Sequence, residues 1–269
     1  MLCGLICMIK KTKEKYGKAF ALPQEEKNMS EFHIPEVPQS TSFADRSFSV
    51  NKAIARSYIW MFAGLVISAI SSWFIIATNL LYSMGGILAG VLLIAQLVTV
   101  VGFSAAMYSS SATTLKVMFI IYSALTGVTI ASLTEMYSAG TIYVAFAISA
   151  FYFGCLAVIG FTTNKDLTKM GTICTIGLFA LIISQLIMLL FRTPMSIRLY
   201  SIVGLIMFTG LTAWDTSRLN KVMTMTDGNP VEQEKYSIFF ALELYLDFVN
   251  IFLYIVRLLG MGSSSSSKN

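Results

Sequence analysis

A charge-free stretch from Ser57 to Leu115 constrains the fold of this chain more than any other feature. It contains no Asp, Glu, Lys or Arg in 59 consecutive residues, and a helix needs about 20 apolar residues to cross a bilayer. The stretch therefore predicts two membrane-spanning helices. The apolar runs are continuous rather than alternating, which excludes a transmembrane β-barrel.

The remaining apolar runs predict five more spans. Val117 to Asn164 contains one charge, Glu135, and the small-residue turn at Ser138, Ala139 and Gly140 divides it into two spans. Three further runs lie at about 171–191, 197–221 and 236–258. The sequence thus predicts an all-α integral membrane protein with seven transmembrane helices.

The charged residues are concentrated before the first span. Only 12% of the chain is charged, against roughly 25% in a soluble domain. Residues 1–56 hold 15 of the 33 acidic and basic side chains. We therefore expect a polar, flexible N-terminal tail over 1–56, a seven-helix membrane domain over 57–260 and a short Ser-rich tail over 261–269. The Lys and Arg residues outside the tail lie mostly between apolar runs, which argues against a nucleic-acid partner.

The orientation follows from the Lys and Arg residues near the ends of the spans. If the amino end is inside, the inner segments carry Arg46, Lys52, Arg56, Lys116, Lys165, Lys169, Arg218, Lys221 and Lys235. The outer segments carry only Arg192, Arg198, Arg257 and Lys268. This bias predicts a cytoplasmic N-terminus. Seven spans place the carboxyl end outside, unless the last segment enters the membrane and turns back.

The sixth and seventh spans contain the residues best suited to chemistry, because intramembrane charges are costly and usually functional. Asp215 lies toward the inner end of span six, and Asp247 lies about a third of the way into span seven. An antiparallel hairpin can bring them to similar depth. On span seven the polar residues recur at intervals of four, three, four and three, which is one helix face pointing into the bundle: Glu243, Asp247, Asn250, Tyr254 and Arg257.

Two interpretations of these acids stay open at this point. Carboxyl groups in contact within a low dielectric cannot both stay ionised, so Asp215 and Asp247 could share a proton and act as a proton sensor. Alternatively, Asp215 caps or snorkels at the interface with Arg218 as its partner, while Asp247 is tied to a hydroxyl or a backbone group.

Several segments resemble the Bax inhibitor-1 family, also called the transmembrane Bax inhibitor motif proteins. The resemblance is carried by Gly210–Thr216, Leu244–Asn250, Leu253 and Arg257–Gly260, and Gly160–Thr168 is similar to its bacterial members. It covers about residues 50–260. It implies a seven-helix fold whose last helix is surrounded by the other six, and a calcium leak governed by a di-aspartyl pH sensor at Asp215 and Asp247.

One departure from the family stands out. Relatives carry an arginine near the inner end of the second span, where it can pair with the sensor, whereas this chain reads Met107-Tyr-Ser-Ser-Ser111 and has no basic residue before Lys116. Glu243 adds a third acid one turn before Asp247, as in some animal members.

The leading functional hypothesis is a pH-sensitive calcium leak channel of the bacterial inner membrane, not an enzyme. Its partners would be the lipid bilayer, protons and calcium, with calcium as a transported ion and no bound cofactor. Oxygen atoms of Asp215, Asp247 and Glu243 would line the cation path, and the supporting residues would be Arg218, Asn250 and Tyr254.

Two other functions compete with the leak channel. The resemblance also implies a regulatory interaction protein that modulates a membrane-bound protease or a stress response. An aspartyl intramembrane protease would also use two Asp residues on neighbouring helices. It would need Gly-x-Gly before the second Asp, where this chain has Tyr245 and Leu246.

Overall fold

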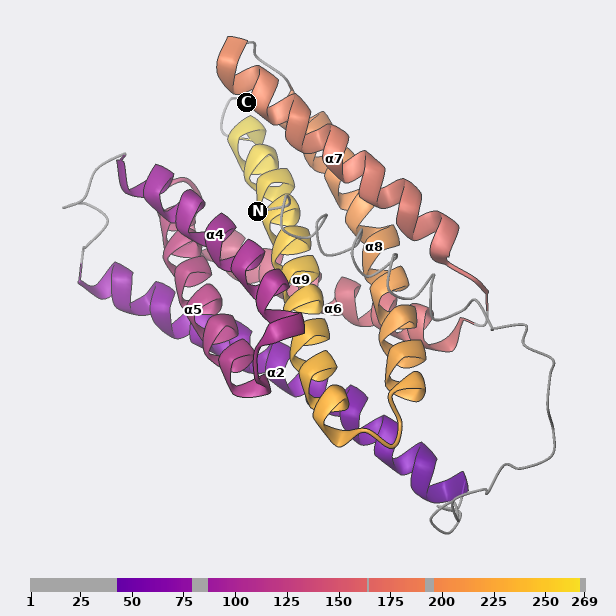
Figure 1. The fold of residues 1–269 in the computed structure, drawn as a ribbon. Coiled ribbons are helices and arrows are strands. Elements are labelled where there is room, and N and C mark those ends of the chain that lie inside the picture. Colours follow the sequence, from indigo (N-terminus) through magenta and orange to yellow (C-terminus); the bar gives the residue numbers. More distant parts are fainter. Residues whose placement is uncertain (1–42, 79–86, 164, 192–195, 267–269) are drawn as a thin grey trace, which may run out of the picture.

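The structure, a computed structural model, describes residues 43–78, 87–163, 165–191 and 196–266. These residues form one 3₁₀ helix, η1, Ser132–Glu135, and seven α-helices, with no strand among them (Figure 1). The α-helices are α2 (Phe43–Ala77), α4 (Ile87–Ser109), α5 (Ala112–Ala131), α6 (Ala139–Thr162), α7 (Thr168–Phe191), α8 (Ile197–Met225) and α9 (Pro230–Ser266). The all-α class and the helix order predicted from the apolar runs are confirmed.

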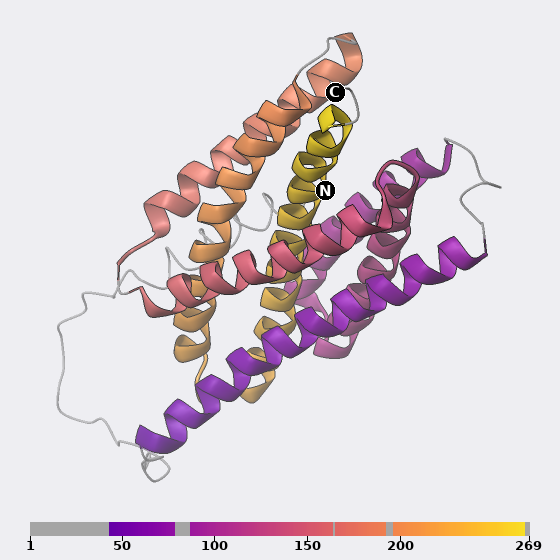
Figure 2. The ribbon, with the colours of Figure 1, turned by 180° about the vertical axis from the view of Figure 1, so that it is seen from behind.

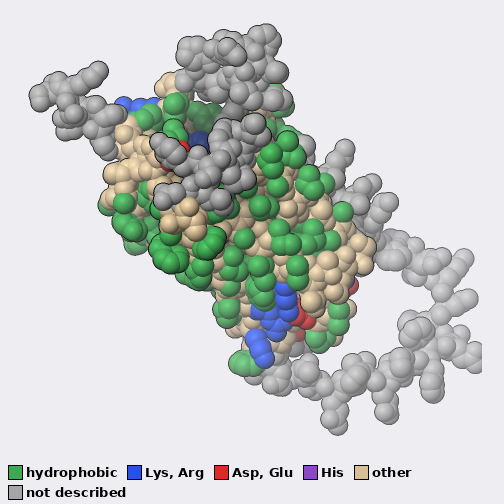
Figure 3. Space-filling view, turned by 90° about the vertical axis from the view of Figure 1, so that its left-hand side faces the viewer, with side chains coloured by type: hydrophobic (Ala, Val, Ile, Leu, Met, Phe, Trp, Pro, Cys, Tyr) green, Lys and Arg blue, Asp and Glu red, His purple; other side chains and the backbone are tan. Residues whose placement is uncertain are grey.

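The described helices suit a membrane environment. Five of them are long and apolar enough to cross a bilayer (α2, α5 with η1, α6, α8 and α9), and the described apolar parts of α4 and α7 are shorter. Large apolar side chains such as Phe62, Trp73, Phe151 and Ile173 are exposed on the outside. Figure 3 shows hydrophobic side chains over much of one face, with charged side chains near its lower and upper ends. A surface of this kind is stable against lipid tails rather than water.

Helix α9 is the centre of the bundle. In its most apolar stretch 89% of the residues are buried, against 22–44% in the other four spanning candidates. It packs on α2, α5, α6 and α8, while α4 packs on α5 and α7 packs on α8. In Figure 1, α4 and α5 lie on one side of α9 and α7 and α8 on the other, and from behind α2 and α6 cross it (Figure 2). The four inner neighbours therefore make most of the contacts to α9.

Short polar caps separate the helices. Ser111, Ser138 and Ser196 each accept a hydrogen bond from the backbone N–H three residues on, at the starts of α5, α6 and α8. Before α9, Gly228 adopts a φ of 90°, and the Asn229 side chain accepts from the Glu232 N–H. Pro230 then opens the helix, where its missing N–H costs nothing. These residues therefore turn the chain from α8 into α9.

The first and last helices extend beyond the predicted boundaries. Helix α2 begins at Phe43 rather than at residue 57, and Ala53 and Ile54 are buried. The helix therefore continues into the charged segment because one of its sides still packs on the core. Helix α9 continues to Ser266 without turning back, so it ends at the opposite end of the bundle from the α8–α9 turn. Residues 1–42 of the tail predicted over 1–56 lie outside the described residues.

Candidate functional site

The candidate site is a cluster of four charged side chains between α8 and α9, which we call the acid cluster: Asp215, Arg218, Glu243 and Asp247. The three acidic residues are only 1–2% exposed, and the Arg218 side chain is 14% exposed. The Asp215 and Asp247 carboxyl groups lie within hydrogen-bonding range of one another. The antiparallel hairpin thus brings the two predicted sensor residues together.

Arg218 is the cation of the cluster. It lies one turn after Asp215 on α8, with its Nη1 3.7 Å from Asp215 Oδ1, and it donates a hydrogen bond to Glu243 Oε2 on α9. Its guanidinium also lies over three aromatic rings, 4.7 Å from the centroid of Trp214, 5.1 Å from that of Phe240 and 5.8 Å from that of Phe239. Aromatic faces stabilise a cation where water is scarce. The interfacial alternative, in which Arg218 partners Asp215, therefore describes one real contact, but this Asp215 is buried.

Two carboxyl oxygens in the cluster are buried without a hydrogen bond. Among the described residues, neither Asp215 Oδ1 nor Asp247 Oδ2 has a hydrogen-bond partner. Asp247 also interacts with the Thr212 hydroxyl. The charges that act on Asp247 are those of Asp215, Glu243 and Arg218. One guanidinium thus faces three carboxyl groups, which leaves negative charge or protons to be accommodated in the core.

Two residues next to the acid cluster, Thr212 and Trp214, were not among the predicted site residues. Thr212 and Asp215 stand three residues apart on α8, so helical spacing could have placed the Thr212 hydroxyl beside the acids. The stacking of Trp214 on Arg218 follows from side-chain conformations that no spacing rule predicts.

The other predicted supporting residues have partners outside the acid cluster. Asn250 donates its side-chain N–H to the Leu246 carbonyl, 2.6 Å away on its own helix. The Tyr254 ring packs against Gly204, where a Cβ would clash with it, and its ring centroid lies 5.9 Å from that of Phe208. Arg257 lies 5.8 Å from the Tyr254 ring. The polar stripe of α9 therefore divides into an acid part that faces α8 and a part that packs structurally. Glu135 is exposed at the end of η1.

The second span supplies no cation to this cluster. Met107, near the end of α4, is 7% exposed, and α4 packs mainly on α5 rather than on α9. Arg218 lies beside the acids instead, on the same helix as Asp215. Within the described ranges, no three His, Cys, Asp or Glu side chains are grouped so as to hold a metal ion.

A second buried polar group lies on another side of α9. The Tyr245 hydroxyl is 2.6 Å from Ser68 Oγ on α2. Ser68 also donates to the backbone carbonyl of Ser123 on α5, at 2.8 Å. We call these three residues the hydroxyl cluster. Tyr245 and Ser123 are fully buried and Ser68 is 1% exposed, so α9 carries polar groups on two sides, and only one side is charged.

Comparison with known proteins identifies the family. A family model described as "Inhibitor of apoptosis-promoting Bax1" matches residues 50–264, which include the acid cluster and all of the seven α-helices except the start of α2 and the last two residues of α9. The chain belongs to the Bax inhibitor-1 family. The resemblance seen in the sequence covers about residues 50–260, and the family model matches nearly the same range. The resemblance is therefore confirmed.

Bacterial relatives match most of the chain. Inner membrane protein YbhL of Escherichia coli K12 is 33% identical over 233 residues, 83% of this chain and 97% of its own length. An uncharacterized protein of Borreliella burgdorferi is 37% identical over 217 residues, 78% of this chain and 92% of its own. Protein YrjE of Lactococcus lactis is 34% identical over 229 residues, 83% of this chain and 96% of its own. The similarity thus extends over whole proteins rather than one motif.

Proposed function

We propose that this protein is a proton-gated calcium leak in the inner membrane of a bacterium, with Asp215 and Asp247 as its proton sensor. The observation that carries the proposal is the uncompensated charge of the acid cluster: one guanidinium faces three carboxyl groups, and two carboxyl oxygens lack a hydrogen bond among the described residues. A buried oxygen of this kind is costly unless it meets a proton, a cation or water.

Protons would act on the contact between α8 and α9. When Asp215 and Asp247 share one proton, they form a charge-assisted hydrogen bond across the helix pair. A second proton removes the remaining negative charge and weakens this bond. Because Arg218 still holds Glu243, the hairpin stays together while Asp247 separates from Asp215. This movement would open the path for ions.

Calcium would be the cargo rather than a resident metal. Carboxylate oxygens are the ligands that hard cations prefer, and Asp215 and Asp247 each have one oxygen without a hydrogen bond in the described part of the chain. Glu243 is paired with Arg218. It would therefore influence the electrostatic potential along the calcium path rather than bind the ion directly. The proposal includes no catalysis and no bound cofactor.

The location and the orientation are part of the proposal. The apolar helices suit a bilayer, and the relative YbhL is named an inner membrane protein. The bias of Lys and Arg favours a cytoplasmic N-terminus. A reporter fused at Asn28 should be cytoplasmic, and one in the 193–196 turn should be external. If both lie on one side of the membrane, the seven-span topology is wrong.

Two measurements test the sensor and the leak separately. Trp214 lies beside Arg218, so in a protein with Trp60 and Trp73 replaced by Phe its fluorescence should change with pH as the acid cluster titrates. Calcium flux from the same protein in liposomes should change over the same pH range. Asp215→Asn and Asp247→Asn should flatten both profiles. The matched control, Glu135→Gln at the exposed end of η1, should leave both unchanged.

The outcomes separate the competing functions. If both Asn variants keep the wild-type pH profile of flux, the sensor hypothesis fails. If the wild type carries no calcium at any pH, the leak hypothesis fails. A regulatory protein that acts on a membrane-bound protease would then be the better explanation, and co-purification with such a protease would test it.

A further inference from the structure

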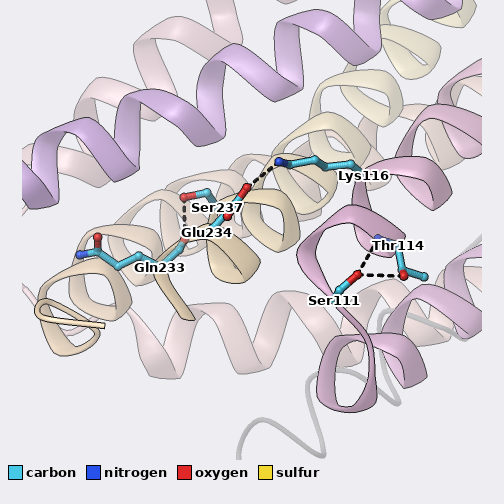
Figure 4. A network of polar contacts seen from close by, with 6 residues as sticks. All are labelled: Ser111, Thr114, Lys116, Gln233, Glu234 and Ser237. Atoms are coloured by element: carbon cyan, nitrogen blue, oxygen red, sulfur yellow. Dashed lines mark hydrogen bonds and ion pairs between the residues drawn. The ribbon is translucent and has the colours of Figure 1, made fainter. Parts of the chain in front are cut away.

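The first turns of α9 carry a polar network outside the acid cluster. Three side chains near the start of the helix, Gln233, Glu234 and Ser237, each contact a different neighbouring helix. We call these three residues and their partners the clasp. Figure 4 shows Lys116 reaching from α5 to Glu234, with Gln233 and Ser237 beside it.

The contacts of the clasp fix α9 in three directions. Glu234 Oε1 lies 2.5 Å from Lys116 Nζ on α5. The Ser237 hydroxyl shares its proton between the Gln233 carbonyl of its own helix, at 2.7 Å, and the Ala53 carbonyl on α2, at 3.1 Å. Gln233 donates to the Met223 carbonyl on α8 at 3.4 Å. Hydrogen bonds and ion pairs are directional, so these three contacts fix both the axial position and the rotation of α9. Apolar contacts further along the helix restrict the rotation less.

Lys116 is itself held in place. Ser111 caps α5, accepting a hydrogen bond from the Thr114 N–H at 3.3 Å, so the helix that carries Lys116 begins at a defined residue. The Lys116 ammonium lies 5.7 Å from the Trp60 ring centroid on α2, and Arg56 of α2 also acts electrostatically on Glu234. The charged groups around Glu234 are therefore Lys116 and Arg56, both from neighbouring helices.

The clasp is mechanically coupled to the acid cluster through α9. Glu243 follows Glu234 by nine residues, which is two and a half helical turns and about 14 Å along the axis. The two side chains thus point to opposite sides of α9, toward Arg218 of α8 and Lys116 of α5. A rotation of α9 that moves Glu243 away from Arg218 also moves Glu234 away from Lys116.

We propose that Lys116 and Glu234 are positioning residues that hold the rotation of α9, and thereby the approach of Glu243 and Asp247 to α8. This inference rests on the proposed function only for its effect on flux. Its mechanical part stands on the contacts and can be tested without calcium.

The experiment is a charge exchange across the clasp. Lys116→Glu and Glu234→Lys each place like charges together, whereas the double exchange restores an ion pair. The neutral variants Lys116→Gln and Glu234→Gln serve where a reversal prevents folding. The readout is the rate of disulfide formation between cysteines placed at Tyr137 and Gly260, at the far end of α9, in a protein whose four native cysteines are replaced. These positions are close because the Tyr137 ring lies against Gly260.

We expect each single variant to change the rate of disulfide formation by about threefold, the change that corresponds to a modest ion-pair energy. The double exchange should restore the wild-type rate. In the same proteins the pH midpoint of the Trp214 fluorescence change should shift by about half a pH unit and return in the double exchange. For this measurement Trp60 is replaced by Phe in every protein, which keeps an aromatic ring under Lys116.

Each outcome has a defined meaning. Single variants that lower thermal stability but leave the cross-linking rate unchanged would overturn the inference, because the clasp would then only hold the fold together. A changed rate that the double exchange does not restore would also overturn it. If the clasp variants change the cross-linking rate as expected but the wild type shows neither a pH transition nor calcium flux, the positioning role stands and the proposed function fails.

Discussion

The two polar clusters on α9 are equally buried but differ in how their groups are satisfied. In the hydroxyl cluster, Tyr245 meets Ser68, and Ser68 donates to the Ser123 carbonyl. In the acid cluster, Asp215 and Asp247 each keep an oxygen without a hydrogen bond among the described residues. Neutral groups that are fully bonded stabilise a fixed helix contact, whereas uncompensated carboxyl groups respond to protons and ions. The proposed function therefore rests on the side of α9 that faces Arg218, and the hydroxyl cluster serves as its structural counterpart.

The largest expected effect comes from removing the cation of the acid cluster. Arg218→Met leaves three buried carboxyl groups without a counter-ion, and breaking a buried ion pair costs about 3–5 kcal/mol. We expect this loss in the free energy of unfolding near neutral pH, measured in mixed detergent micelles. The loss should shrink on acidification, because protonated acids no longer need the guanidinium.

Two further variants check that explanation. Adding Glu243→Gln to Arg218→Met should recover part of the stability, since one uncompensated acid is removed. Lys221→Met, which removes a half-exposed lysine 3.7 Å from the exposed Asp166, should have little effect. An equal loss in the lysine variant would show that charge in general, rather than the buried pair, stabilises α8.

An intermediate effect is expected for Asp247→Asn. The substitution keeps the shape of the side chain but removes one titrating group, and the amide can donate to Asp215. The change in unfolding free energy between about pH 5 and about pH 8 should become smaller by about 1–2 kcal/mol. Unchanged pH dependence would place the titrating groups elsewhere and remove the contrast between the two clusters.

A smaller effect is expected for Tyr245→Phe in the hydroxyl cluster. The hydroxyl is lost, but Ser68 keeps its bonds to the Gly64 and Ser123 carbonyls, so no polar group is orphaned. The cost should be about 1 kcal/mol, equal at all pH values, in the same unfolding assay. If this variant shifted the pH profile as much as Asp247→Asn does, the hydroxyl cluster would belong to the sensor.

The smallest effect is expected outside the membrane, at Asp166. Hydrogen bonds from Thr168, with Lys221 nearby, hold the pKa of this exposed carboxyl below its ordinary value. Because the pKa is lower in the folded state, the ionised Asp166 side chain stabilises the fold above the unfolded-state pKa. This stabilisation is lost as the pH falls through the folded-state pKa. Asp166→Asn should therefore lower the melting temperature slightly at neutral pH and not at all in strong acid. A larger shift in acid than at neutral pH would contradict this.

The sequence by itself determined the class of fold and the helices that matter. Long apolar runs can only become membrane helices, because backbone groups in lipid must be bonded within the segment. For this reason the seven helices and the hairpin that joins Asp215 to Asp247 could be predicted. Helical spacing also placed Glu243 and Asp247 on one face of α9. The ends were less predictable, since α2 continues to Phe43 through a charged segment that has one packed side.

Only the tertiary structure decided which polar residues act together. Spacing along α9 groups Asn250 and Tyr254 with the acids, but Asn250 bonds to its own helix and Tyr254 packs on Gly204. Spacing along the chain likewise does not predict that Arg218 reaches Glu243, that Lys116 reaches Glu234 or that Tyr245 meets Ser68. The physical reason is that periodicity fixes the direction in which a side chain leaves its own helix, whereas its partner depends on the rotation and depth of the neighbouring helix, which the packing of the whole bundle sets.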